Sequence, residues 1–291
     1  MATVLLTGAS GYIADYIMDG LQRSHALRLV DNRPGPDVVV RDLTDARTLD
    51  RHRDLFRGAD AVVHLAFQRP EASDAVAGYL AERGNVDTAF VIYQLALEEG
   101  VRRVVVASSN HAADFYEGPL RRRTLELVGT DEPRPLADNF YGWSKEAYEH
   151  LGFVYATGAL GRPLEVVQIR IGAPRDLATT SFVDDRRNDP LTLHRDLGMW
   201  ISPRDLTQLT LRAIDAPDLR DRWGVPFQVV YGISGNTRST WSLANARTVL
   251  GYVPRDDSEI VYADEIRRWI VEPQRGAMVS AEARGGLGRR V

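Results

Sequence analysis

The chain of 291 residues is 44% hydrophobic and 26% charged, the composition of a globular protein long enough for a full hydrophobic core. Its formal net charge is −4, and its 36 lysines and arginines are scattered along the chain, so it offers no basic field for nucleic acid. The absence of cysteine excludes disulfides, thiol nucleophiles and cysteine metal sites, and the six histidines show no metal-ligand spacing, so we expect no metal centre.

The first predicted element is a short strand over residues 4–6, which ends in a glycine turn and is followed by a helix. Gly8 and Gly11 let the backbone turn sharply and approach a pyrophosphate, whose charge then lies against the helix N-terminus. Ala14 stands where the dinucleotide-binding fingerprint usually has its third glycine, and a small residue is accepted there. Such a turn can be merely structural, but its place directly after a buried strand favours cofactor binding.

The second predicted strand, over residues 26–30, ends in Asp31 and Asn32, about 20 residues after the glycine turn. An acid at this place accepts hydrogen bonds from the adenosine ribose and repels a 2′-phosphate. The sequence therefore favours NAD over NADP, although the neighbouring Arg33 keeps NADP open. The alternative is that Asp31 only caps the end of the strand.

A third apolar run, over residues 38–40, leads into Asp42, which we expect to face the adenine edge of the cofactor. Thr44 is predicted to cap a helix that extends to about residue 56. The alternation of strands and helices is typical of an α/β protein with a parallel sheet.

The fourth predicted strand, over residues 61–67, ends where an open parallel sheet binds its ligands. The small Ala66 at this end allows a cofactor to approach closely. His64 lies inside the strand and is predicted to be a hydrogen-bonded core residue rather than a base. A long helix from about residue 75 to residue 100 follows and carries Asn85.

Four polar residues follow the next buried strand, which covers residues 104–107. They are Ser108, Ser109, Asn110 and His111. Polar residues grouped directly after a buried strand are better explained by a site than by packing. The alternative is a helix or turn cap, which serine and asparagine serve equally well.

A Tyr-x-x-x-Lys pair opens a predicted helix that runs from Tyr141 to about residue 161. Residues four apart share one face of a helix, so the Tyr141 phenol and the Lys145 ammonium can point into the same cavity. A nearby cation stabilises a phenolate and makes the phenol usable as a general acid or base. Most such pairs are solvated surface, so the prediction depends on the motifs that precede this one.

The rest of the chain is predicted to add a strand over residues 164–170 and a loop over residues 175–198 that closes over a substrate. Further predicted elements are a helix from residue 202, a strand at 227–231, and helices at 242–250 and 258–271. We expect a doubly wound parallel sheet with a small C-terminal substrate lobe. The expected units are a dinucleotide-binding core (1–170), a substrate lobe interleaved with it (171–279) and a polar tail (280–291). No apolar run approaches the ~20 residues that span a bilayer, and no signal peptide is evident, so a cytoplasmic protein without membrane partners is expected.

Taken in order, these motifs resemble the extended short-chain dehydrogenase/reductase superfamily and its NAD-dependent epimerase/dehydratase family. The set consists of Thr7-Gly8-x-x-Gly11, Asp31, Asp42-Leu43, His64-Leu65-Ala66, Asn85, Ser108-Ser109 and Tyr141-x-x-x-Lys145. Within the superfamily, residues 108–111, 141–145, 170–172 and 195–200 are most similar to uronate dehydrogenases. Those enzymes use NAD to oxidise the anomeric carbon of a hexuronic acid to an aldarolactone.

The resemblance implies NAD as cofactor and a small-molecule sugar or sugar acid as substrate. Ser109 would hydrogen-bond the reacting oxygen, Tyr141 would transfer its proton, and Lys145 would lower the pKa of Tyr141 and hold the nicotinamide ribose. Asn85 would stabilise the active-site helix or a proton-relay water. The implied cofactor-binding residues are Gly8, Gly11, Tyr12, Ile13, Asp31, Asn32, Asp42, Leu43, Leu65, Ala66, Phe67, Asn85, Ser108, Tyr141, Lys145 and Ile171.

The implied substrate-binding residues are Ser109, Asn110, His111, Tyr141 and Arg195. Asn110 and His111 would contact sugar hydroxyls, and Arg195 would pair with a substrate carboxylate in a bidentate fork. The alternative for Arg195 is a surface arginine on a loop. A homodimer, or a higher homo-oligomer, is a further expectation, because helices equivalent to 85–99 and 141–160 pair between subunits in many members of the superfamily.

Two departures leave the substrate open. Ala173 stands where the uronate enzymes present a serine, and residues 67–70 replace a glycine- and serine-containing stretch around the sugar. Two other functions remain possible on these motifs. An NAD-retaining sugar or nucleotide-sugar epimerase would use Ser109, Tyr141 and Lys145 unchanged. A non-catalytic dinucleotide-binding regulator is disfavoured, since it would not need this complete set.

Overall fold

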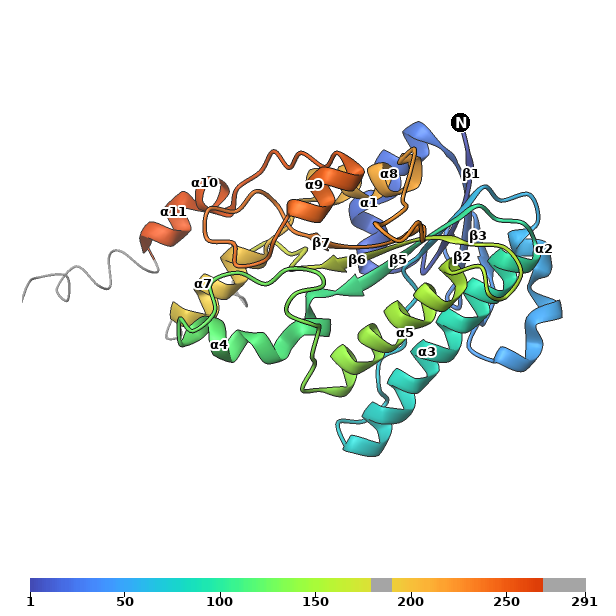
Figure 1. Cartoon of the computed structure of the whole chain (residues 1–291), viewed down its shortest axis with the longest axis horizontal. Coiled ribbons are helices and arrows are strands. Elements are labelled where there is room, and N and C mark those ends of the chain that lie inside the picture. The colour runs from blue at the N-terminus through green and yellow to red at the C-terminus, as the bar shows by residue number, and fades with distance from the viewer. Residues whose placement is uncertain (179–189, 269–291) are drawn as a thin grey trace, which may run out of the picture.

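A seven-stranded parallel sheet forms the centre of the computed structural model, which describes residues 1–178 and 190–268 (Figure 1). Its strand order is β3-β2-β1-β4-β5-β6-β7. The strands are β1 (Thr3–Thr7), β2 (Ala26–Asp31), β3 (Val38–Val40), β4 (Ala61–His64), β5 (Arg103–Ser109), β6 (Glu165–Ile171) and β7 (Phe227–Gly232). The order reverses direction between β1 and β4, which creates a crevice at the carboxyl ends of these strands. The predicted doubly wound parallel sheet is confirmed.

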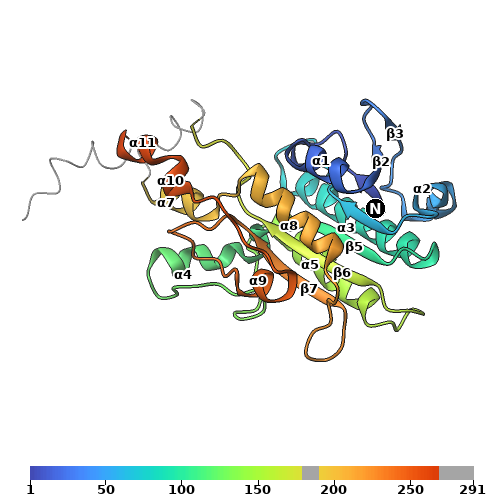
Figure 2. The same cartoon turned by 90° about the horizontal axis from the view of Figure 1, so that it is seen from above.

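Helices cover both faces of the sheet (Figure 2). One face carries α1 (Tyr12–Ser24), α8 (Pro203–Asp215) and α9 (Ala244–Leu250), and the other carries α2 (Arg53–Phe56), α3 (Ala75–Glu98) and α5 (Phe140–Ala156). Successive strand residues point to opposite faces, so Val4 and Leu6 pack beneath α1 while Leu5 packs on the α3 side. Because both faces are covered, the central strands are mostly apolar, and most of their polar residues lie toward the strand ends.

Shorter helices gather beyond the carboxyl ends of β5, β6 and β7 (Figure 1). They are α4 (Glu117–Arg121), α7 (Pro190–Met199), α10 (Ser258–Val261) and α11 (Ala263–Ile266), with a 3-10 helix, η2 (Asn110–Tyr116), leading into α4. A small apolar cluster that includes Leu197, Trp200 and Tyr262 holds α7, α10 and α11 together. In contrast, α8, β7 and α9 belong to the layers of the main sheet. No helix within 1–178 and 190–268 is long and apolar enough to cross a membrane.

Several predicted boundaries were wrong. Thr44 caps no α-helix: Asp45 instead accepts a hydrogen bond from the Arg47 backbone and begins a 3-10 helix, η1 (Ala46–Arg51). Thr44 donates its own backbone N–H to Asp42, so the chain is still turning there.

Other corrections concern the second half of the chain. The predicted loop at 175–198 contains α7, and its residues 179–189 lie outside the described part. The helix predicted at 258–271 is two short helices separated at Tyr262, and its end beyond residue 268 is not described. The helix that begins near Tyr141 ends at Ala156 rather than near residue 161. The predicted polar tail, 280–291, also lies outside the described residues.

Candidate cofactor and catalytic site

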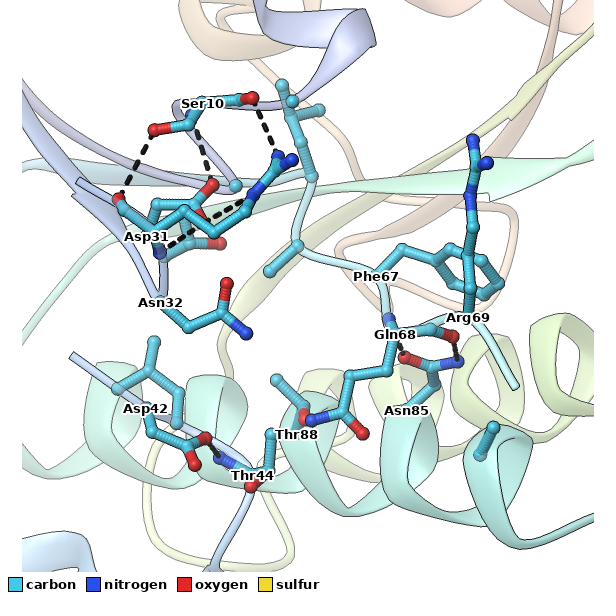
Figure 3. A pocket seen from close by; sticks show the side chains of 18 of the residues that line it. Ser10, Asp31, Asn32, Asp42, Thr44, Phe67, Gln68, Arg69, Asn85 and Thr88 are labelled. Carbon is cyan, nitrogen blue, oxygen red and sulfur yellow. Dashed lines mark hydrogen bonds and ion pairs between the residues drawn. The ribbon is translucent and has the colours of Figure 1, made fainter. Parts of the chain in front are cut away.

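A cavity of about 1040 Å³ lies at the carboxyl ends of β1, β2 and β4, where the strand order reverses (Figure 3). Most of the predicted cofactor-binding residues line it: Gly8, Gly11, Tyr12, Ile13, Asp31, Asn32, Asp42, Leu43, Leu65, Ala66, Phe67 and Asn85. Ser108, Tyr141, Lys145 and Ile171 do not line this cavity, and Ile171 is buried as the β6 partner of Ser109. This volume lies at the upper end of the range for small-molecule and cofactor sites.

The glycine turn leaves no room for a side chain. Gly8 has φ +76°, and a Cβ on it would lie 2.5 Å from the backbone nitrogen of Ala66. The Gly11 N–H donates to the Gly8 carbonyl at 3.0 Å, which closes the turn directly before α1. The backbone of β1 and that of the β4 loop therefore approach each other at the floor of the cavity. This bare cradle before a helix N-terminus fits a dinucleotide pyrophosphate.

Asp31 is held by backbone donors at the end of β2 (Figure 3). One carboxylate oxygen accepts the Ser10 N–H at 3.0 Å, and the other accepts the Arg33 N–H at 2.9 Å. The Arg33 guanidinium reaches back to the Ser10 carbonyl at 2.7 Å. Each carboxylate oxygen keeps further acceptor capacity, so the residue can still take hydrogen bonds from a ribose.

Tyr141 and Lys145, both on α5, meet Ser109 at the end of β5. The Tyr141 phenol is hydrogen-bonded to the Ser109 side chain, and Lys145 Nζ lies 5.2 Å from the centre of the Tyr141 ring. Lys145 Nζ donates to the Ala107 carbonyl at 3.0 Å. Burial raises the pKa of Tyr141, and the Ser109 hydrogen bond opposes that rise. Burial also lowers the pKa of Lys145 to about 8, although the nearby Glu82 and Glu149 act in the opposite direction.

Aromatic neighbours fix the plane of the Tyr141 ring. Phe67 and His111 each contact it edge to face, with ring centres 5.3 Å away. The His111 ring is held in turn by Asp114, with 2.6 Å between Nδ1 and Oδ2. The phenol is therefore positioned from three elements: α5, η2 and the loop after β4.

A buried ion pair supports the catalytic end of α5. Arg170 on β6 forms a bidentate pair with Glu149 on α5, at 2.9 and 2.7 Å. The Ser108 hydroxyl donates to the same Glu149 carboxylate, so it points toward α5. Both charged side chains are almost fully buried, so the pair locks the position of α5 against the sheet. Sequence reasoning missed Glu149, although its position four residues after Lys145 places it on the same helix face.

Asn85 fastens the loop that follows β4 (Figure 3). Its side chain accepts the Gln68 backbone N–H at 2.8 Å and donates to the Gln68 carbonyl at 3.0 Å. Asn85 also donates to Glu82, which accepts a hydrogen bond from Ser144 on α5. Asn85 thus orders the cavity wall through the Gln68 backbone. Glu82 was missed because a lone acid inside a long helix gives no sequence signal.

None of the five candidate substrate-binding residues lines the cavity, and two of them, Asn110 and Arg195, remain to be described. Asn110 is completely buried, and its amide donates to the Met199 sulfur at 3.2 Å. Arg195, on α7, forms ion pairs with Glu117 of α4 and with the adjacent Asp196. The guanidinium of Arg195 is therefore already neutralised by carboxylates of this chain. In the described residues, no group of three or more metal-ligating side chains gathers.

A parallel sheet with this glycine turn, an acid at the end of β2, and a Ser, Tyr and Lys set at the end of β5 defines an enzyme of the short-chain dehydrogenase/reductase class. Residues 4–163 match the NAD dependent epimerase/dehydratase family, and the chain belongs to that family. The expected family, fold and NAD cofactor are thereby confirmed.

Two curated relatives come from Haloferax volcanii. A protein named NAD-dependent glucose-6-phosphate dehydrogenase is 34% identical over 88% of this chain and 94% of its own. One named L-arabinose 1-dehydrogenase (NAD(P)(+)) is also 34% identical, over 90% of this chain and 99% of its own. Among solved structures, glucuronic acid dehydrogenase from Chromohalobacter salexigens superimposes with a TM-score of 0.71. It is 30% identical, with 92% of this chain and 89% of that chain covered.

Proposed function

We propose that this protein is an NAD-dependent dehydrogenase that oxidises the anomeric carbon of a free sugar or sugar acid. The observation that carries the proposal is the Ser109, Tyr141 and Lys145 arrangement, in which a half-buried phenol is hydrogen-bonded to a hydroxyl and lies beside a buried ammonium. A dinucleotide-binding regulator would need the glycine turn but not this set. The names of the relatives support a free sugar, since they refer to glucose 6-phosphate, arabinose and glucuronic acid.

In this reaction the substrate loses a proton from its hydroxyl oxygen and a hydride from the carbon that bears it. Tyr141, as phenolate, accepts the proton, and Ser109 donates a hydrogen bond to the same substrate oxygen. The Lys145 ammonium stabilises the phenolate electrostatically. When bound, NAD supplies the hydride acceptor. A cyclic sugar oxidised at its anomeric carbon leaves as a lactone.

The test is to follow NADH formation with purified protein, NAD or NADP, and a panel of glucose, arabinose, glucuronate, galacturonate, glucose 6-phosphate and nucleotide sugars. NADH formed with a free sugar supports the dehydrogenase. Interconversion of a sugar without net NADH would replace it with the epimerase. Tyr141→Phe should lose most turnover while keeping NAD affinity, since the phenol oxygen carries the proton. Full activity in that variant would contradict the mechanism.

We further propose that the protein is a homodimer that pairs α3 and α5 of two subunits. Tyr79 stacks on Trp143 and contacts Phe140 edge to face, with ring centres 5.9 Å apart in each pair, and all three side chains are exposed. An exposed aromatic cluster across two adjacent helices is typical of an interface. Light scattering should give the dimer mass for the wild type and the monomer mass for Trp143→Glu. A wild-type monomer would contradict this proposal.

A further inference from the structure

The loop after β4 presents a positively charged side chain to the site. Asn85 clamps Gln68 in this loop through two backbone hydrogen bonds, so the residues on either side of it are fixed as well. On one side, the Phe67 ring packs against Tyr141. On the other side, Arg69 lines the cavity. In Figure 3, Arg69 lies at the opposite end of the cavity from Asp31, and it extends away from Asn85.

The charge of Arg69 is available to a ligand. Within the part of the chain that the structure describes, no carboxylate lies within ion-pair distance of Arg69, although Glu71 also lines the cavity. The charge also reaches the catalytic phenol: burial and nearby acids raise the pKa of Tyr141, and Arg69 acts against that rise. The same electrostatic reach would act on a substrate bound to Tyr141.

The other arginines near the site have partners in this chain, and Arg41, which also lines the cavity, lies 3.8 Å from Asp54. Arg195 is paired with Glu117 and Asp196. Arg33 caps the turn around Asp31, which is the adenosine end of the cavity. Lys145 is buried and donates to the Ala107 carbonyl, beside the reacting phenol. Arg69 is therefore the arginine that remains for a substrate anion close to Tyr141.

We propose that Arg69 binds an anionic group, a carboxylate or a phosphate, on the sugar substrate and so sets the preference of the enzyme for anionic over neutral sugars. This inference rests on the proposed dehydrogenase function. A guanidinium presents a planar fork of donors that matches both anions, and an ammonium in its place would supply only a point charge. The anion would anchor the end of the sugar remote from the reacting carbon, which turns binding energy into orientation at Tyr141.

The experiment compares kcat/KM for glucuronate, glucose 6-phosphate and glucose in the wild type and in Arg69→Gln, Arg69→Lys, Arg195→Gln and Arg83→Gln. Arg83 is an exposed arginine of α3 that does not line the cavity, so its variant controls for the change in net charge. We expect Arg69→Gln to lower kcat/KM for an anionic sugar by about 10- to 100-fold, mainly through KM. Glucose should be nearly unaffected, and Arg69→Lys should recover part of the loss. Comparing the loss of kcat/KM for glucuronate with that for glucose 6-phosphate shows whether Arg69 binds a carboxylate or a phosphate.

An equal loss for charged and neutral sugars would overturn the proposal. The proposal would also be overturned if Arg69→Gln left kcat/KM unchanged while Arg195→Gln lowered kcat/KM selectively for the anionic sugars. If the wild type oxidises glucose but neither anionic sugar, Arg69 has no such role while the dehydrogenase function stands. If no sugar yields NADH, calorimetric binding of the two anionic sugars to the NADH complex separates the cases. If an anionic sugar binds the wild type and Arg69→Gln abolishes that binding, the anion site is supported but the proposed reaction is not. If neither anionic sugar binds, both the anion site and the dehydrogenase function are overturned.

Discussion

Glu82 on α3 accepts a hydrogen bond from the Ser144 hydroxyl on α5 at 2.5 Å. This carboxylate is buried and lies close enough to the catalytic pair to raise the pKa of both Tyr141 and Lys145. Burial is the largest influence on both pKa values. Because its negative charge disfavours the phenolate and favours the ammonium, Glu82 moves the pH range in which the pair works to higher pH.

Glu82→Gln keeps an oxygen that can accept the Ser144 hydrogen bond but removes the charge. The pKa of Tyr141 and the pKa of Lys145 should both fall, so the whole pH profile of sugar oxidation should move to lower pH. Ser144→Ala is the matched control, because it removes the hydrogen bond and keeps the charge. The measurement is the rate of sugar oxidation across a pH series. An unshifted pH profile in Glu82→Gln would show that the role of Glu82 is structural.

The buried Lys145 ammonium is expected to lower the free energy of unfolding. Its pKa falls from 10.5 to about 8 on burial, which corresponds to about 3 kcal/mol at neutral pH. The unfolded state holds the proton more tightly, so the free energy of unfolding should rise with pH between about 8 and 10.5. Lys145→Met should abolish turnover yet unfold at a higher temperature at pH 7, with an advantage that shrinks across this window. The Ala107 carbonyl keeps the Tyr148 hydroxyl as a donor in this variant. A variant less stable than wild type at pH 7 would refute the argument.

His64 should make the protein acid-sensitive. Burial, and secondarily the Lys145 charge, lowers the pKa of His64 from 6.5 to about 3. The His64 ring shares one hydrogen bond with the Thr7 hydroxyl, with 2.8 Å between Nδ1 and Oγ1. Since the unfolded state takes up the proton first, stability should fall as the pH drops from 6.5 toward 3.

The double variant Thr7→Val with His64→Leu removes both partners and should flatten this acid dependence. His64→Leu alone leaves the Thr7 hydroxyl buried without its partner, which costs about 1–3 kcal/mol. Urea unfolding at several pH values measures both effects. A wild-type slope retained in the double variant would assign the acid sensitivity to other groups.

The sequence predicted features whose cause is local. The glycine turn between β1 and α1 follows from residue types that are adjacent in the chain, and the Tyr141 and Lys145 pair follows from helix periodicity. The prediction that His64 is a hydrogen-bonded core residue is also confirmed. These elements needed no knowledge of which distant segments meet.

Features that depend on contacts between distant segments could not be predicted. Glu149 meets Arg170 only because α5 packs on β6, and the Asn85 clamp on Gln68 depends on the exact register of α3. The ion pair between Arg195 and Glu117 joins residues that are 78 apart in the chain. The error at Thr44 has a different origin: Asp45 is an equally good cap one residue later, and local propensity does not choose between them.

Gly142 provides a test of how closely α5 must approach η2. A Cβ on it would lie 2.1 Å from the His111 carbonyl oxygen and 2.6 Å from the Ala137 side chain. Gly142→Ala must therefore push α5 away from η2 and displace the Tyr141 phenol from Ser109. We expect a loss of stability of about 1–3 kcal/mol. A displacement of about 1 Å at a reacting group can cost about 100-fold in rate.

Gly78→Ala is the matched control, because Gly78 lies in α3 and its added Cβ would meet only the Phe140 ring, at 3.7 Å. Glycine in a helix interior is less favourable than alanine by about 0.5–1 kcal/mol, so this variant should be slightly more stable, with unchanged turnover. Thermal unfolding and steady-state rates on both variants separate close packing from helix propensity. If Gly142→Ala matched Gly78→Ala in both measurements, the contact between α5 and η2 would not be what positions the phenol.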